Sequence, residues 1–193
     1  MKTFIIENNL YCGQEGEPVW SFLPDSALCN AGKPFFIPEN ADSMTAFISP
    51  AIKITRLGKS IAPRFSKRYY SEAAPAIHFR DMGYREYLTR HGLPTDMSQA
   101  FDRALIIGDF ENAVTILGET PLSMYKNNEK VDEWKKDDLT TTIDELFPAI
   151  SASNTLKMGD YLIPALSIGT GVKIGDNLEL RLGDKTILNV MIK

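Results

Sequence analysis

Short apolar runs broken by glycine and proline dominate the first third of the chain. Residues 2–6 (KTFII) predict a short opening strand, and residues 51–61 alternate apolar and polar side chains at their start, as a half-buried strand does. The apolar runs 19–24 and 33–38 each end at a proline. Proline is excluded from helix interiors and favours edge strands and turns, so this part of the chain is predicted to be β.

Two segments carry helical signals instead. Residues 82–92 place aromatic and apolar side chains at helical spacing, and Gly92, followed by Leu-Pro, makes a plausible stop. Later in the chain, Thr142 and Glu145 form a capping box that opens a second helix. Pro148 falls inside that helix, so its first turns must start close to the proline or kink there.

The remaining segments predict further strands. Residues 103–110 and 113–119 are short, apolar and β-branched, and residues 123–134 read as a hairpin with Asn127–Asn128 at its tip. Residues 156–193 are punctuated by Gly-Asp turn signals throughout. No linker or low-complexity tract interrupts residues 1–193, so the sequence predicts a single α+β domain that is predominantly β, with two short helices.

The amino-acid composition of the chain limits the kinds of partner that it is expected to bind. Of 193 residues, 44% are apolar and 24% charged, with 21 basic against 25 acidic side chains and a net charge of −4. A general nucleic-acid binder needs clustered positive charge, and the one basic run, residues 64–70, is interpreted as a solvated loop or strand edge. No apolar run approaches the ~20 residues of a membrane span. We therefore expect neither a nucleic-acid nor a membrane partner.

The N-terminus and the cysteines indicate the compartment. The N-terminal segment is not typical of a signal peptide, because its apolar part is short and is followed by acidic and polar residues. Cys12 and Cys29 fit buried or incidental thiols better than a disulfide, which predicts a cytoplasmic protein. With two cysteines and two histidines, a structural zinc site is nearly excluded.

Six collinear segments resemble the fumarylacetoacetate hydrolase family over nearly the whole chain. The segment FRDMGY…HGLPTDMSQAFD resembles the family's ARDxQ…GxPWxxAKSFD, and ITRLGKSI ends like its metal-binding strand, which closes on Ile-Gly-Lys. The other four segments match less specific family patterns: MKTFIIENN, FLPDSALCNAGKPFFIP, YKNNEKVDEWKKDDLTTTIDELFPAIS and LKMGDYLIPALSIGTGVKIGDNLEL. The resemblance implies a mixed-sheet β-roll, usually dimeric, that hydrolyses, decarboxylates or isomerises small oxo or diketo acids.

The family's chemistry uses a divalent ion, usually magnesium, held by a Glu-x-Glu on one strand and an aspartate downstream. Counting back from Gly58, the glutamate positions fall on Pro50 and Ile52; counting back from Arg80, the aspartate position falls on Ala76. No carboxylate occurs from residue 45 to residue 71. These side chains donate no oxygen, so the sequence predicts that magnesium is absent or weakly bound and that no other cofactor is used.

Other family positions differ as well. Gln99 and Leu23 replace two lysines, and Cys12 and Gly13 stand where a histidine is expected. The family's Thr-Gly-Thr-Pro turn, a substrate-binding loop, is replaced by residues 163–166 (IPAL). These losses also predict a degenerate site.

Four residues remain as pocket candidates: His78, Arg80, Asp81 and Gln99. In an extended segment His78 faces the same side as Ala76, where it is either a general base or a structural histidine. Arg80 can hold a substrate carboxylate; alternatively it orients the loop together with Asp81, which would then be the N-cap of the following helix.

Three interpretations follow from the resemblance. The first is a family member that keeps the fold, as a homodimer with a small oxo-acid ligand, but has lost catalysis. The second is an active hydrolase or a 2-hydroxy-diene-dioate-type isomerase whose rewired, metal-independent site includes His78, Arg80 and Gln99. The third is a non-catalytic partner subunit of an active paralogue.

Overall fold

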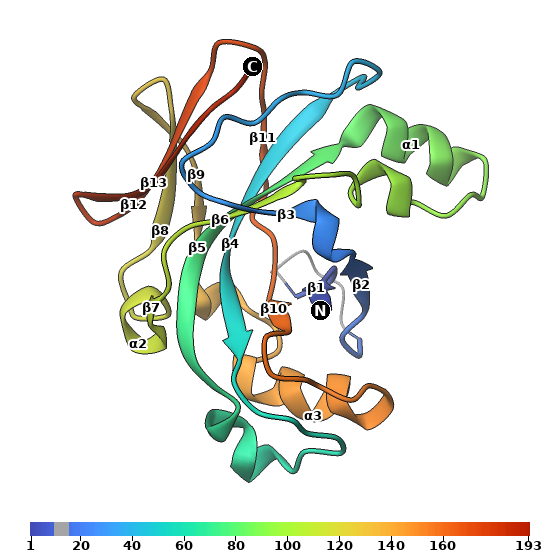
Figure 1. Ribbon diagram of the computed structural model, residues 1–193, viewed down its shortest axis with the longest axis vertical. Helices are drawn as coiled ribbons and strands as arrows, with labels where there is room; N and C mark the ends of the chain where they lie inside the picture. The colour runs from blue at the N-terminus through green and yellow to red at the C-terminus, as the bar shows by residue number, and fades with distance from the viewer. Residues whose placement is uncertain (10–15) are drawn as a thin grey trace.

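The computed structural model describes residues 1–9 and 16–193, which fold into two β-sheets flanked by short helices (Figure 1). The interpretations that concern Cys12 and Gly13 lie outside the described residues. Cys29 is half-buried. Among the described residues, no helix is long and apolar enough to cross a membrane.

The larger sheet is mixed and contains nine strands. They are β1 (Thr3–Ile6), β2 (Trp20–Leu23), β3 (Leu28–Asn30), β4 (Met44–Ile54), β5 (Tyr70–Asp81), β6 (Leu105–Ile107), β7 (Glu111–Asn112), β10 (Tyr161–Ile163) and β11 (Thr170–Gly171). The order is β2-β1-β10-β4-β5-β6-β3, with β11 on β4 and β7 on β5. The β1–β10 and β3–β6 pairs are parallel and the others antiparallel. This arrangement confirms the predicted mixed sheet.

The smaller sheet is antiparallel, in the order β13-β12-β8-β9, and consists of the hairpins β8–β9 and β12–β13 joined through β8 and β12. Its strands are β8 (Leu122–Lys126), β9 (Glu129–Trp134), β12 (Asn177–Leu182) and β13 (Lys185–Met191). Asn127 and Asn128 join β8 to β9 with φ of 52° and 71°. Both angles lie in the left-handed region that asparagine tolerates, so the predicted hairpin is confirmed.

Both predicted helices are present, as α1 (Met82–Arg90) and α3 (Ile143–Ser153). The capping box between Thr142 and Glu145 forms, and α3 accommodates Pro148 in its interior. Gly92 follows α1 with a φ of 65°, as its role as a stop requires. Short 3₁₀ helices complete these helical elements: η1 (Asp25–Ala27), η2 (Pro63–Arg68), η3 (Asp96–Ser98) and η4 (Lys136–Asp138).

The strand predicted over residues 113–119 is wrong. Residues Ala113–Ile116 form the one-turn helix α2. The Asn112 side chain accepts the Val114 N–H and caps this turn, and Ala113 and Ile116, three residues apart, face the core. Tertiary burial at helical spacing outweighs the β-branched composition of the segment.

The long β4–β5 pair separates two apolar clusters. One face carries Ile48, Ile52 and Ile77, which belong to the main core with Phe147 of α3 and Leu180 of the smaller sheet. The other face carries a second cluster that joins β1, β2, β6 and β10, around which the larger sheet curls: Ile5, Leu23, Ala27, Ala51, Ala74, Ala76, Ala104, Leu105, Ile107 and Ile163. Both faces of β4 are therefore buried, whereas the sequence predicted a half-buried strand.

Candidate functional site

Two of the predicted site residues, His78 and Arg80, lie at alternate positions near the end of β5. They therefore point to the same face of the sheet as Ala76. Their partners across the strand pair are Phe47 and Thr45 of β4. His78 is 1% exposed and Arg80 5%, so both side chains are buried.

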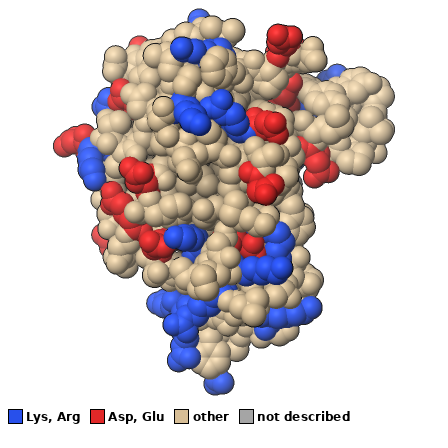
Figure 2. Space-filling model, viewed as in Figure 1, with Lys and Arg blue, Asp and Glu red and all other residues tan. Residues whose placement is uncertain are grey.

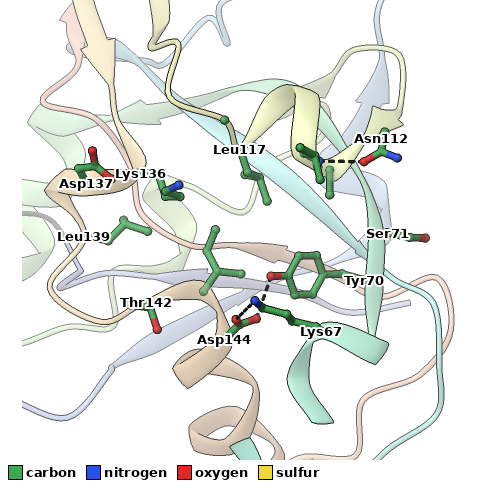
Figure 3. A pocket seen from close by; sticks show the side chains of 14 residues that line it. Lys67, Tyr70, Ser71, Asn112, Leu117, Lys136, Asp137, Leu139, Thr142 and Asp144 are labelled. Atoms are coloured by element: carbon green, nitrogen blue, oxygen red, sulfur yellow. Dashed lines mark hydrogen bonds and ion pairs between the residues drawn. The ribbon is translucent and has the colours of Figure 1, made fainter. Parts of the chain in front are cut away.

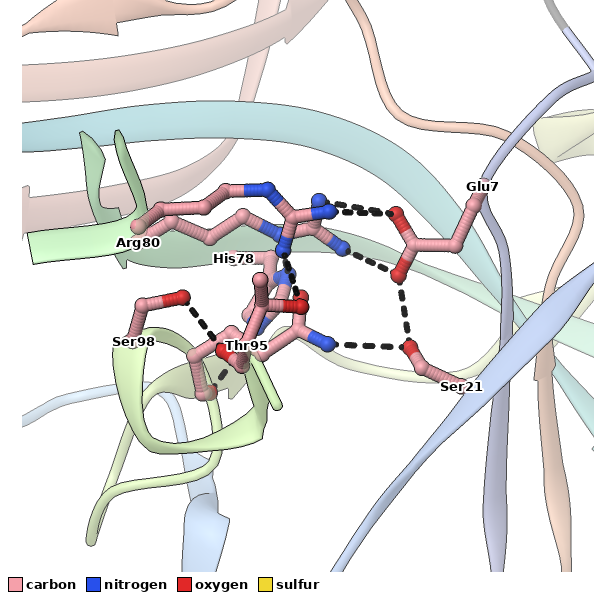
Figure 4. A network of polar contacts seen from close by, with 8 residues as sticks. Glu7, Ser21, His78, Arg80, Thr95 and Ser98 are labelled. Carbon is pink, nitrogen blue, oxygen red and sulfur yellow. Dashed lines mark hydrogen bonds and ion pairs between the residues drawn. The ribbon is translucent and has the colours of Figure 1, made fainter. Parts of the chain in front are cut away.

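Arg80 is bound by a carboxylate that sequence reasoning missed, Glu7, which follows β1 directly. The two terminal guanidinium nitrogens of Arg80 donate to the two Glu7 carboxylate oxygens, each at 2.9 Å (Figure 4). Ser21 of β2 donates its hydroxyl to Glu7 Oε1 at 2.6 Å, and Arg85 of α1 lies 3.9 Å from Glu7 Oε2. Burial raises the pKa of Glu7, but the charge and hydrogen bonds of Arg80 outweigh burial and lower it.

His78 is held by contacts to both of its ring nitrogens. Arg80 Nε donates to Nδ1 at 3.3 Å, so the ring proton lies on Nε2, which donates to the Gln99 carbonyl at 3.2 Å. Burial, reinforced by the charge of Arg80, lowers the pKa of His78 to about 3. The ring is therefore neutral near physiological pH, and its one basic nitrogen is already engaged by Arg80.

Gln99 closes the network at the end of η3. Its Nε2 donates to Ser21 Oγ at 3.1 Å. Gln99 is 1% exposed, yet its Oε1 has no hydrogen-bond partner among the described residues. A buried acceptor without a partner is uncommon in folded proteins, because its desolvation costs free energy that no hydrogen bond offsets.

Asp81, the fourth candidate, is not part of this network. Its carboxylate accepts N–H groups from Tyr84 at the start of α1 and from Asp42 and Ser43 on the loop before β4. Burial raises the pKa of Asp81, but these backbone hydrogen bonds outweigh burial and lower it. The structure therefore confirms Asp81 as the N-cap of α1.

The positions assigned to the metal ligands need a correction. In the β4–β5 ladder Ala76 is directly opposite Ser49, and Ala74 is opposite Ala51. Directly paired residues share a face, so Ser49, Ala51 and Ala76 lie together, whereas Pro50 and Ile52 point to the opposite face. Pro50, Ile52 and Ala76 therefore cannot form one ligand set.

The residues that share this face, Ser49, Ala51 and Ala76, do not fit a magnesium ion. All three residues are buried and together supply one hydroxyl and no carboxylate, whereas a hard divalent cation needs several oxygen ligands. Within residues 1–9 and 16–193, no three histidine, cysteine or carboxylate side chains group closely enough to hold a metal ion.

The other described positions that depart from the family are apolar, and all of them except the half-buried Leu166 are buried. Leu23 and Ile163 pack in the second apolar cluster, and Leu166 packs against it. The Pro164 carbonyl accepts the Asn9 amide at 2.9 Å. Asn9 is 2% exposed and also forms hydrogen bonds with Thr141, so it connects the end of residues 1–9 to the loop before α3.

A separate cavity of about 900 Å³ opens between η2, α2 and the start of α3 (Figure 3). Its lining includes Leu117, Leu139 and Ile143, with Lys67 and Asp144 beside Tyr70. The Tyr70 hydroxyl donates to Asp144 at 2.8 Å, and burial followed by this contact raises the pKa of Tyr70. None of the predicted site residues lines this cavity.

Comparison with known proteins supports the fold independently. No family model matches the chain. Oxaloacetate tautomerase YcgM of Escherichia coli (strain K12) is 25% identical over 147 residues, which span 75% of this chain and 67% of that protein. Two of the solved structures that align over 100% of the chain illustrate the similarity.

The first solved structure is a Yersinia pestis CO92 protein assigned to the fumarylacetoacetate hydrolase family, with a TM-score of 0.92, 23% identity and 93% of that chain covered. The second is fumarylpyruvate hydrolase of Pseudomonas aeruginosa in complex with Mn²⁺ and pyruvate, with a TM-score of 0.89, 17% identity and 89% covered. The resemblance found in the sequence is thereby confirmed, and the chain has the fold of the fumarylacetoacetate hydrolase family.

Proposed function

We propose that this chain is a divergent fumarylacetoacetate hydrolase-family protein that does not carry out metal-dependent chemistry on oxo acids. One observation carries the proposal: Ser49, Ala51 and Ala76 occupy the shared face on which three carboxylates would have to converge. A hydroxyl and two methyl groups leave a hard cation largely hydrated. The chain then acts as a non-catalytic partner subunit, paired with a second copy of itself or with an active relative.

The buried network also supports loss of catalysis. The planar donor of Arg80, which suits a substrate carboxylate, is already satisfied by Glu7 at 2.9 Å. His78 is neutral and engaged at both ring nitrogens. A substrate carboxylate would have to displace Glu7 from Arg80. To act as a general base, His78 would have to lose its hydrogen bond from Arg80.

The test is metal titration combined with turnover. We expect calorimetry with Mg²⁺ and Mn²⁺ to give no saturable heat with the purified chain. Oxaloacetate tautomerisation and acylpyruvate hydrolysis should proceed at the uncatalysed rate whether or not metal is added. Stoichiometric metal binding, or turnover that depends on metal, would overturn the proposal.

A second candidate function is metal-independent keto–enol tautomerisation of a small oxo acid. It is favoured by the 25% identity to an oxaloacetate tautomerase. Tautomerisation needs only a positioned base and a donor to the developing oxyanion, and His78 and Gln99 are the groups available. Metal-free turnover that is lost in His78→Gln and kept in His91→Gln would establish this function in place of the first.

A further inference from the structure

One end of the molecule carries a basic patch that the proposed function does not use. The patch consists of six exposed cations on the loop after β4, on η2 and on the loop after α3: Arg56, Lys59, Arg64, Lys67, Arg68 and Lys157. On the face that Figure 2 shows, the lower end of the molecule carries Lys and Arg and no Asp or Glu, and Figure 1 places η2 and α3 at this end. The chain as a whole has a net charge of −4, so positive charge is concentrated here.

The charges of the basic patch are almost unneutralised. Within the described part of the chain, only Lys67 of the six forms an ion pair, with Asp144 at 3.8 Å. The guanidinium carbons of Arg64 and Arg68 lie 4.8 and 4.6 Å from the centre of the Phe65 ring. Both arginines are held in place by this ring and keep their charge free for an external anion.

Two apolar side chains project from the same patch. Leu57 is 70% exposed and Met158 is 75% exposed. Their loops run side by side, because Gly58 and Leu156 exchange backbone hydrogen bonds of 3.0 and 2.8 Å. Exposed apolar side chains surrounded by cations match a bilayer interface, where cations meet lipid headgroups and apolar groups enter the acyl boundary.

We propose that the basic patch docks this protein on an anionic lipid bilayer, with Leu57 and Met158 entering the interface. The sequence-based expectation of no membrane partner rested on the lack of a long apolar segment, which concerns spanning segments alone. Acidic residues elsewhere orient the molecule, because they are repelled by the same surface that attracts the patch.

Two other occupants fit the patch less well. Single-stranded nucleic acid needs aromatic faces for base stacking, but the Phe65 ring is covered by two guanidinium groups, and Tyr70 stacks on Phe147 at 5.3 Å. A second copy bound through the same patch would bring six cations against six.

The test is co-sedimentation of the full chain with phosphatidylcholine vesicles, with and without phosphatidylserine. We expect binding only to the vesicles that contain phosphatidylserine, and loss of binding as salt rises from ~0.05 to ~0.5 M. Lys59→Glu/Lys157→Glu should weaken binding at least about tenfold. These two lysines are exposed and make no ion pair in the described residues, so we expect this variant to fold as the native chain does.

The matched control is Lys33→Glu/Lys173→Glu. It makes the same charge change on exposed loops beside the C-terminal strand, at the opposite end of the molecule, and should bind as the native chain does. Leu57→Ser/Met158→Ser should weaken binding without changing its salt dependence. Equal loss in both lysine variants, equal binding to neutral vesicles, or binding to single-stranded RNA without binding to anionic vesicles would overturn the proposal.

Discussion

Arg80 and Glu7 lie 73 residues apart in the chain and form a buried ion pair through two hydrogen bonds of 2.9 Å each. The side chain of Arg80 is 7% exposed and that of Glu7 is 19% exposed. A cation buried to this extent depends on its counterion, because removing one partner leaves the other charge without solvation. The pair therefore connects β1 to the end of β5 energetically as well as spatially.

Glu7→Gln should destabilise the fold by about 2–4 kcal/mol, because the buried guanidinium of Arg80 loses its counterion while Arg85 remains nearby. Urea unfolding at neutral pH measures the change. The control is Glu86→Gln, which breaks the exposed pair with Arg90 and should change stability by no more than about 0.5 kcal/mol. Equal effects of the two substitutions would contradict the buried pair.

His78 gives the fold a defined sensitivity to acid. Its pKa falls from the ordinary value of 6.5 to about 3 on folding, so between these values the unfolded chain binds a proton that the folded chain does not. The stability contributed by neutral His78 is complete above pH 6.5 and is lost progressively as the pH falls towards 3. At pH 5 the loss should be about 2 kcal/mol relative to pH 7.

Urea unfolding at pH 7 and pH 5 tests this dependence, and the window lies above the range in which Glu7 titrates. His78→Gln should lack the extra loss between the two pH values, whatever its stability at pH 7. The other histidine, His91, is exposed, and His91→Gln should follow the native pH dependence. If His78→Gln lost as much stability between pH 7 and pH 5 as the native chain, the result would contradict a neutral, buried imidazole at His78.

The sequence predicted best where a few adjacent residues decide the structure. The capping box at Thr142, the Asn127–Asn128 turn and the cap at Asp81 each have a signal within four residues along the chain, and each is present. Glu7 escaped prediction because its partners come from β5, β2 and α1, and nothing beside it in the chain marks it. Long-range pairing leaves no local pattern.

The assignment of the metal-ligand positions from the sequence was wrong for a different reason. Counting back from Gly58 assumes that the strand continues to Gly58, but β4 ends at Ile54. A count along one strand does not show which face a residue shares with the neighbouring strand, and a one-residue error moves every side chain to the other face. The pairing of Ser49 with Ala76 places Ser49 and Ala51, and not Pro50 and Ile52, on the face of Ala76, which the sequence alone does not show.

Asp81 should behave as a structural cap. Asp81→Ala removes the acceptor for the N–H groups of Asp42, Ser43 and Tyr84 and should cost about 2–3 kcal/mol. Asp81→Asn keeps one acceptor oxygen and should cost about half as much. Thermal unfolding with circular dichroism measures both. Native stability in Asp81→Ala would remove the argument for a capping role.

The pairing of β4 with β5 predicts which residues must change to create a metal site. The variant Ser49→Glu/Ala51→Glu/Ala76→Asp places three carboxylates on one face, and they should repel one another until a divalent ion neutralises them. Adding Mn²⁺ should therefore raise its melting temperature, because an ion that binds only the folded state stabilises it by mass action. In the matched control Pro50→Glu/Ile52→Glu/Ala76→Asp, two carboxylates point into the main core and one to the opposite face, so Mn²⁺ should have no such effect. Stabilisation of the control by Mn²⁺, or a folded first variant that ignores Mn²⁺, would show that the shared face has been assigned incorrectly.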